Sequence, residues 1–202
     1  MERKVMSRMV IGVTALLVFF GCANGNQKAP SAEGKKVVMI IASQQFRDEE
    51  LRDPKSVLEQ AGVQVQVASS TLDELEGMLG MKVLPDLLVD SLQVADYDAV
   101  IFVGGVGAQE YWADSTAHMI AQTAVDSGKV LGAICIAPVT LANAGVLSGK
   151  KATVWSSERG KLEVAGALCT GADVEVDGKV VTASGPQAAE EFGRSIVKLL
   201  SE

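Results

Sequence analysis

Residues 130–138 read VLGAICIAP, an apolar run that ends in one cysteine and one proline. The first five residues have the character of a strand buried on both faces, as in a parallel sheet. Pro138 cannot continue a strand ladder, but it fits the first turn of a helix. Residues 139–144 are typical of that helix. We therefore expect a strand, a sharp turn at Cys135 and a helix.

A cysteine at such a turn has the geometry of a nucleophile elbow, with sulfur in place of the usual serine oxygen. The N-terminus of the following helix would offer free N–H groups and a partial positive charge. Both favour a thiolate, so we expect the pKa of Cys135 to be lowered. The alternative is that Cys135 is a small buried hydrophobic residue without reactivity.

Apolar strand-length runs alternate with helical patterns on either side of this segment. This alternation predicts an α/β fold: a doubly wound, mostly parallel sheet with helices on both faces. Asp177-Gly178 adds a hairpin signal, and Pro54 leads us to begin the first helix near Asp53. The expected strands are 36–42, 63–68, 97–104, 130–134, 151–155, 174–176 and 180–183, and the expected helices are 51–61, 116–127 and 188–200, with a short helical turn within 72–79.

In such sheets the functional site lies beyond the carboxyl ends of the strands. Three loops satisfy that condition, namely 43–50, 104–109 and 135–138. Gly104 and Gly105 allow a close backbone approach, and a backbone N–H there, paired with that of Ile136, would form an oxyanion hole. The alternative is a tight turn that needs glycine only for its backbone angles.

The first of these loops carries three consecutive carboxylates, Asp48, Glu49 and Glu50. One of them could turn inward, meet the sulfur and transfer a proton, with its pKa raised by the neighbouring negative charge. The alternative is a solvated acidic loop near a helix N-terminus. His118 lies on a predicted helix, and we expect it to be remote from Cys135.

The composition excludes several classes of protein. The chain has 202 residues, 48% of them hydrophobic, and a formal net charge of −7. One compact domain with a real core fits this length. The acidic balance argues against nucleic acid as a partner. A single histidine argues against a metal site, and we expect no cofactor.

Residues 1–21 have the pattern of a signal peptide, with Arg3, Lys4 and Arg8 before an apolar segment. Cys22 follows Gly21, as in bacterial lipoproteins that are lipidated on such a cysteine. Residues 22–34 are polar and predict a flexible tether, with the domain spanning 35–202. We thus expect an extracytoplasmic protein of the cell envelope that contacts the membrane only through its lipid anchor. The alternatives are an ordinary secretory signal and an uncleaved anchor.

Four motifs resemble the ThiJ/PfpI superfamily, which has a glutamine-amidotransferase-like, flavodoxin-type three-layer fold. They are ELRDP at 50–54, YDAVIFVGG at 97–105, AICIAP at 133–138 and VDGKVVTASGP at 176–186. The resemblance implies that Cys135 is an oxidation-prone nucleophile with Glu50 as its carboxyl partner. It places the oxyanion N–H groups on Gly105 and Ile136.

We further expect Gly104, Trp155 and Pro138 to border the pocket. Two departures from the superfamily stand out. Protease-like members carry histidine directly after the cysteine, where this chain has Ile136. The deglycase branch carries a histidine near the position of Trp155. Without either histidine, peptide hydrolysis is disfavoured, because no group shuttles the proton of the leaving amine.

The resemblance implies an enzyme of the glyoxalase or deglycase type, acting on a small carbonyl substrate or a glycated protein through Cys135 and Glu50. Two alternatives remain, a redox sensor in which Cys135 is oxidised and a tethered binding module without catalysis. We expect no disulfide between Cys135 and Cys169, because Cys169 lies in a separate segment. The resemblance also implies a homodimer.

Overall fold

The computed structural model describes residues 1–2 and 31–202. The predicted signal peptide, the lipidation site at Cys22 and most of the expected tether lie outside the described residues and stay predictions. Within the described part, no helix is long and apolar enough to cross a membrane. Residues 31–34 belong to the folded part, because Ala32 is buried and its N–H donates to the carbonyl of Ala61 at 3.0 Å.

Seven strands form the central sheet, in the order β10-β11-β7-β6-β1-β2-β5. All neighbours in it run parallel except β10 and β11, which form the antiparallel hairpin expected from Asp177-Gly178. The strands are β1 (Lys36–Ile40), β2 (Gln64–Ser69), β5 (Leu87–Leu88), β6 (Ala99–Phe102), β7 (Val130–Ile134), β10 (Val174–Asp177) and β11 (Val180–Ala183).

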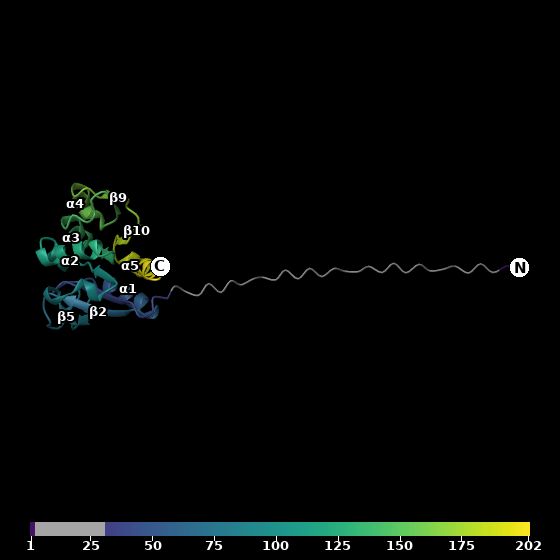
Figure 1. The fold of residues 1–202 in the computed structure, drawn as a ribbon, viewed down its shortest axis with the longest axis horizontal. Coiled ribbons are helices and arrows are strands. Elements are labelled where there is room, and N and C mark those ends of the chain that lie inside the picture. Colours follow the sequence, from purple (N-terminus) through teal and green to yellow (C-terminus); the bar gives the residue numbers. More distant parts are fainter. Residues whose placement is uncertain (3–30) are drawn as a thin grey trace.

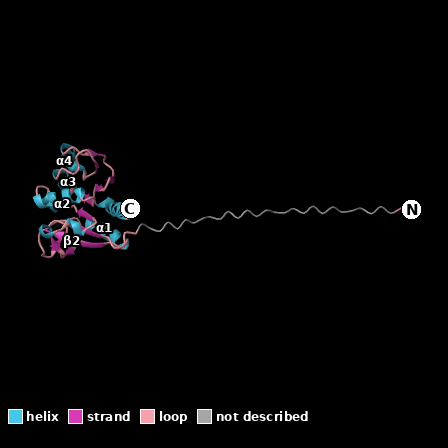
Figure 2. Cartoon of the chain, viewed as in Figure 1, coloured by secondary structure: helices cyan, strands magenta, loops and turns pink. Residues whose placement is uncertain are grey.

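Helices cover both faces of this sheet (Figures 1 and 2). α1 and α5 pack against each other on one face, and α2 packs against β6 and β7 on the other. The helices are α1 (Asp48–Gln60), α2 (Ser115–Asp126), α3 (Pro138–Asn143), α4 (Arg159–Val164) and α5 (Ala189–Leu200). The prediction of a doubly wound, mostly parallel, three-layer α/β fold is confirmed.

The core lies where β1, β6 and β7 run side by side. Every residue of β6 and β7 is buried, which explains why these strands read as unbroken apolar runs rather than alternating ones. Gly132 in β7 is the point of closest helix approach: a Cβ atom there would stand 2.9 Å from the ring of Phe192 in α5. The strand that leads to Cys135 is therefore held from both faces.

The start of α1 differs from the prediction. The helix begins at Asp48 rather than near Asp53, and Pro54 lies inside it. Proline in a helix interior costs one backbone hydrogen bond. Here Pro54 is buried under α5, with its Cα in the path of a Cβ at Gly193, and the three first-turn carboxylates suit a helix N-terminus. Packing and charge outweigh the lost bond.

Two further elements were not expected. The predicted helical turn within 72–79 is instead part of a hairpin of two short strands, β3 (Leu75–Glu76) and β4 (Lys82–Val83). The predicted strand at 151–155 is shortened to β8 (Lys151–Ala152), which pairs with β9 (Leu168–Cys169) in a small separate sheet. Figure 1 shows β9 and α4 at the end of the domain opposite β2 and β5.

Candidate active site

Cys135 occupies the sharp turn between β7 and α3, as the sequence predicts. Its φ is +63°, in the left-handed region that residues with a side chain rarely adopt. Two hydrogen bonds hold this strained residue: its N–H donates to the carbonyl of Ala183 at 2.9 Å, and its carbonyl accepts from the N–H of Trp155 at 2.8 Å. The side chain is 9% exposed, so the thiol is sheltered but open to a small molecule.

Glu50 is the carboxylate that turns inward. It lies in the first turn of α1 and is fully buried. Within the described part of the chain, neither of its carboxyl oxygens has a hydrogen-bond partner. The polar groups near it include the Cys135 thiol and the backbone N–H of Gly104. A buried carboxyl without a strong partner is costly, which marks it as a functional group rather than a structural one.

Gly104 lies between these two side chains. A Cβ atom at this position would overlap Oε2 of Glu50 and stand 2.5 Å from Cβ of Cys135. Only a residue without a side chain leaves room for the carboxyl and the thiol to face each other. The close backbone approach expected at Gly104 is therefore directed at the side chains of Glu50 and Cys135 and not at a ligand.

The backbone N–H groups of Gly105 and Ile136 both act to lower the pKa of the Cys135 thiol. Gly105 has a φ of +98°, and a Cβ atom there would stand 2.5 Å from the carbonyl of Gln45. The positive φ and the close loop explain why glycine is needed at this position. The two N–H groups have the arrangement of an oxyanion hole beside the nucleophile.

The environment raises the pKa of both members of the pair. Burial raises the pKa of Glu50 to about 7, an effect that the thiol of Cys135 and the charge of Arg47 only partly offset. Burial and the negative charge of Glu50 raise the pKa of Cys135 to about 12, although the two backbone N–H groups oppose the shift. The expectation of a lowered pKa at Cys135 is therefore wrong for the state in which Glu50 is ionised.

The thiol and the carboxyl share a pocket of about 240 Å³. Trp155, 42% exposed, forms one wall as expected, whereas Pro138 is buried in α3 and does not line the pocket. The proline of the pocket is Pro186, which belongs to the motif at 176–186. The full lining is Arg47, Glu50, Met78, Gly105, Val106, Cys135, Ile136, Trp155 and Pro186.

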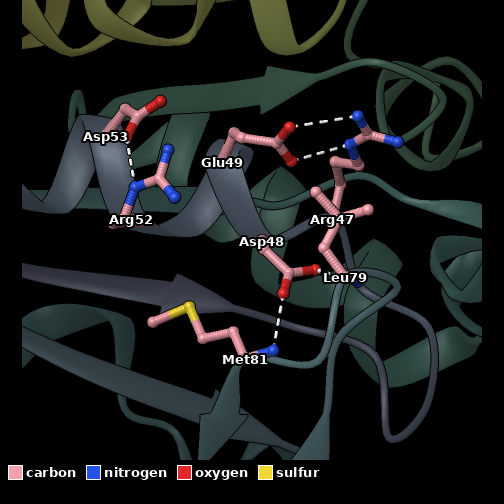
Figure 3. A network of polar contacts seen from close by, with 7 residues as sticks. All are labelled: Arg47, Asp48, Glu49, Arg52, Asp53, Leu79 and Met81. Atoms are coloured by element: carbon pink, nitrogen blue, oxygen red, sulfur yellow. Dashed lines mark hydrogen bonds and ion pairs between the residues drawn. The ribbon is translucent and has the colours of Figure 1, made fainter.

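Sequence reasoning missed Arg47, Met78, Val106 and Pro186. Arg47 directly precedes the acidic triplet, and its guanidinium forms a bidentate pair with Glu49 at 2.8 and 3.1 Å (Figure 3). Val106 follows the glycine pair and Pro186 ends a recognised motif, so proximity to those motifs was an available signal. Met78 offered none, because its segment was expected to form a helical turn.

The remaining candidate residues lie elsewhere. The ring Nε2 of His118 is 3.0 Å from the carbonyl oxygen of Trp112, so this histidine is not part of the site. Cys135 and Cys169 are both free thiols, as expected. Among the described residues, no three His, Cys, Asp or Glu side chains are grouped as metal ligands.

The fold and the elbow define a class: a flavodoxin-like α/β protein with a cysteine at a sharp strand-to-helix turn and a buried carboxyl group beside it. A model of the DJ-1/PfpI family matches residues 35–199. The chain therefore belongs to the DJ-1/PfpI family, and the predicted ThiJ/PfpI resemblance is confirmed.

Three relatives illustrate this membership. An uncharacterised protein of Methanocaldococcus jannaschii is 40% identical over 197 residues, which is 96% of each chain. A deglycase of Pyrococcus horikoshii is 31% identical, over 81% of this chain and 98% of the relative. The crystal structure of a ThiJ/PfpI domain protein from Brachyspira murdochii superposes with a TM-score of 0.81 at 30% identity, over 83% of this chain and 97% of that one.

Proposed function

We propose that this protein is a cysteine-dependent enzyme that acts on small reactive carbonyl compounds, such as 2-oxoaldehydes, or on their adducts with proteins. The observation that carries the proposal is the Glu50 carboxyl, fully buried and facing the Cys135 thiol at the floor of an open pocket. Its pKa of about 7 suits a group that accepts and returns a proton near neutral pH. The deglycase among the relatives supports the substrate class.

In the first step, Sγ of Cys135 adds to the aldehyde carbon and the thiol proton moves to Glu50. The π electrons of the carbonyl move onto its oxygen, which the N–H groups of Gly105 and Ile136 stabilise. Return of the proton from Glu50 to that oxygen yields a hemithioacetal. All atoms of thiol and aldehyde are retained in this adduct.

In the second step, Glu50 removes the hydrogen of the former aldehyde carbon as a proton while the keto oxygen takes up a proton from water, which gives an enediol. Glu50 then returns its proton to the former keto carbon, and the hydroxyl group on the former aldehyde carbon gives its proton back to water as its carbonyl forms. The aldehyde carbon is thereby oxidised and the keto carbon reduced within the same molecule, so no external oxidant is needed. The product is a thioester of a 2-hydroxy acid. Water then cleaves the thioester, releasing the acid and restoring the thiol of Cys135.

This chemistry fits the site better than peptide hydrolysis does. Protonation of a leaving amine needs a general acid beside the nucleophile, and cysteine peptidases use histidine for it. The single histidine of this chain contacts the carbonyl oxygen of Trp112 instead. A free 2-oxoaldehyde that adds to sulfur releases no amine, so it places no such demand on the site, whereas cleavage of a protein adduct needs Glu50 to protonate the leaving amine.

The test is conversion of methylglyoxal by the wild type, Cys135→Ser and Cys169→Ser. We expect Cys135→Ser to lose at least about a thousandfold in kcat/KM, as nucleophile substitutions do. Cys169→Ser is the matched control, since it removes the other free thiol of the described domain and should retain full activity. Full activity in Cys135→Ser would overturn the proposal. If wild type converts no carbonyl but dilute peroxide oxidises Cys135 selectively over Cys169, the redox-sensor alternative is favoured.

A further inference from the structure

The β3–β4 hairpin, with its connecting residues 77–81, forms part of the roof of the active-site pocket. Met78 is the pocket residue it contributes, and the Met78 side chain is 41% exposed. This segment precedes β5 in the chain, far from the Cys135 elbow in sequence. Its position over the pocket therefore depends on contacts outside the hairpin itself.

The carboxylate of Asp48 supplies two hydrogen bonds to the turn of the hairpin, beside the apolar contacts that Leu75, Met81 and Val83 make with the core. Its Oδ2 accepts from the N–H of Leu79 at 2.9 Å, and its Oδ1 accepts from the N–H of Met81 at 2.7 Å (Figure 3). Asp48 is 3% exposed, so both bonds are sheltered from water. Charge-assisted bonds of this kind are about twice as strong as neutral ones. Asp48 lies two residues before Glu50 on α1, which couples the hairpin to the catalytic helix.

The hairpin is shaped to receive this carboxylate. A Cβ atom at Gly77 would stand 2.5 Å from Oδ2 of Asp48 and 2.8 Å from its Cγ. The backbone of Gly77 does not have a positive φ, so the absence of a side chain there serves the contact with Asp48 rather than the turn. One further bond joins the segment to the loop before α1, from the N–H of Met78 to the carbonyl of Phe46 at 2.9 Å.

The hairpin has little stability of its own. Each strand has two residues, and isolated two-stranded hairpins are marginal in water. Its salt bridge from Lys82 to Glu74 is exposed and contributes little. Along its other side runs an open groove of about 560 Å³, which separates it from residues 43–45. The tether at Asp48 thus holds a segment that has open space to move into.

We propose that the β3–β4 hairpin is a lid tethered by Asp48, and that the lid selects substrates by size through Met78. Asp48 is in this view a positioning residue, since it does not line the pocket. With the tether made, Met78 narrows the entrance to Cys135 and admits small molecules. With the tether broken, the lid moves toward the groove and bulkier molecules reach the sulfur. The biological meaning of the lid rests on the proposed function, but its effect on access to Cys135 does not.

The test therefore measures access without requiring turnover. The rate of Cys135 alkylation is measured with iodoacetamide and with the bulkier N-phenylmaleimide, and peptide mass mapping separates Cys135 from Cys169. The size selectivity is the rate with iodoacetamide divided by the rate with N-phenylmaleimide. In Asp48→Ala we expect this ratio to fall by at least about tenfold, because the variant loses two charged hydrogen bonds and the loss of a single one already changes a conformational equilibrium by about that factor. Asp48→Asn keeps one acceptor oxygen and should lie between.

Three further variants make the test specific. Gly77→Ala breaks the same contact from the hairpin side while Asp48 keeps its charge, and it should lower the ratio in the same direction. Met78→Ala should also lower it with the tether intact. Asp53→Ala is the matched control, because Asp53 lies on the same helix and, among residues 31–202, pairs with exposed Arg52 (Figure 3). It should keep the wild-type ratio.

The lid is overturned if folded Asp48→Ala and Gly77→Ala both keep the wild-type ratio. It is also overturned if the reactivity of Cys169 rises in parallel, since that would reflect general loosening. If Asp48→Ala does not fold, Gly77→Ala and Met78→Ala decide the question. Loss of size selectivity in a protein that converts no carbonyl would refute the proposed function and leave the lid standing. If the wild type converts carbonyls while the variants keep the wild-type size selectivity, the proposed function stands and the lid is refuted.

Discussion

The thiol of Cys135 and the carboxyl of Glu50 titrate as one unit, because each lies in the field of the other in a buried site. The first proton leaves the pair near pH 7 and the second near pH 12. Between these values the pair holds one proton and one negative charge. That state contains both a base and a sulfur ready to attack, so it is the reactive form in the proposed mechanism.

Glu50→Gln tests this sharing of a proton. In wild type, we expect the alkylation rate of Cys135 to rise through pH about 7, as the pair loses its first proton. The variant has no base. Its thiol pKa falls below that of wild type because the charge of Glu50 is gone, but burial still raises it, so its rate should rise only at alkaline pH. Near pH 8 we expect the variant to react about 100-fold more slowly, the usual contribution of a general base. Alkylation of Cys169 in the same digest is the internal control, and identical profiles for Cys135 in both proteins would contradict the pairing.

Residue patterns located this site but did not describe its electrostatics. The elbow at Cys135 could be predicted because an apolar strand, a cysteine and a helix-starting proline follow one another closely in the sequence. Choosing Glu50 from three adjacent carboxylates needed the resemblance, because the helix turn that orients them depends on where α1 begins. The pKa of Cys135 was mispredicted because local helix polarity is outweighed by burial and by Glu50, which come from distant parts of the chain.

At the scale of elements, the crossing of α1 and α5 sets the position of Glu50. Gly193 in α5 lies at the crossing, and a Cβ atom there would stand 2.9 Å from Cα of Pro54 and 3.1 Å from Cβ of Val57. The close approach explains how α1 tolerates a proline: the helix is held by packing along the side where the proline lies. Pro54 follows Glu50 by four residues and lies on the same face of α1, so this contact helps to fix the helix that carries Glu50.

Gly193→Ala should therefore destabilise the protein, although alanine is the better helix former by about 1 kcal/mol. Overpacking a tight contact costs about 1–3 kcal/mol, so we expect a net loss of up to about 2 kcal/mol in the free energy of unfolding. Gly160→Ala in α4 is the matched control, because nothing lies within 4 Å of a Cβ atom there, and it should be neutral or stabilising. Urea unfolding measures both. A Gly193→Ala protein that gains as much stability as Gly160→Ala would refute the crossing argument.

Elements with strong patterns were predictable, and those shaped by distant contacts were not. The buried strands β6 and β7 and the amphipathic helix α5 follow from local apolar spacing alone. The β3–β4 hairpin has two-residue strands and depends on Asp48, some 30 residues earlier, so its own residues carry little signal. The same holds for the start of α1, which the local rule for Pro54 places too late.

On the scale of the whole molecule, alternation of strands and helices was enough to predict the sheet, its parallel character and the edge where the site lies. Strand order and the approach of loops across that edge were not available from the sequence, because they are set by the packing of all layers together. The site assembles from α1, the loop after β6 and the turn after β7, with the lid and Trp155 added from two further segments. The buried carboxyl of Glu50 consequently affects both the stability of the fold and the proposed chemistry.

The free energy of unfolding should therefore depend on pH through the titration of Glu50. The pKa of Glu50 is raised in the folded state, to about 7 from an ordinary value near 4.5. A raised pKa contributes stability at low pH that is lost as pH rises through the folded value. Across the interval from about pH 4.5 to pH 7, wild type should lose about 3 kcal/mol relative to Glu50→Gln, whose side chain does not titrate.

Urea unfolding of both proteins at about pH 4.5 and pH 8 measures this difference. As pH rises, the free energy of unfolding of Glu50→Gln should increase relative to that of wild type, because burial penalises the charged form of Glu50. The variant should at the same time lose the carbonyl activity, since the same burial raises the pKa of Glu50 into the range that proton transfer needs. A constant difference between Glu50→Gln and wild type at both pH values would mean that Glu50 titrates normally in the folded protein, and would remove the physical basis for its role as the proton carrier.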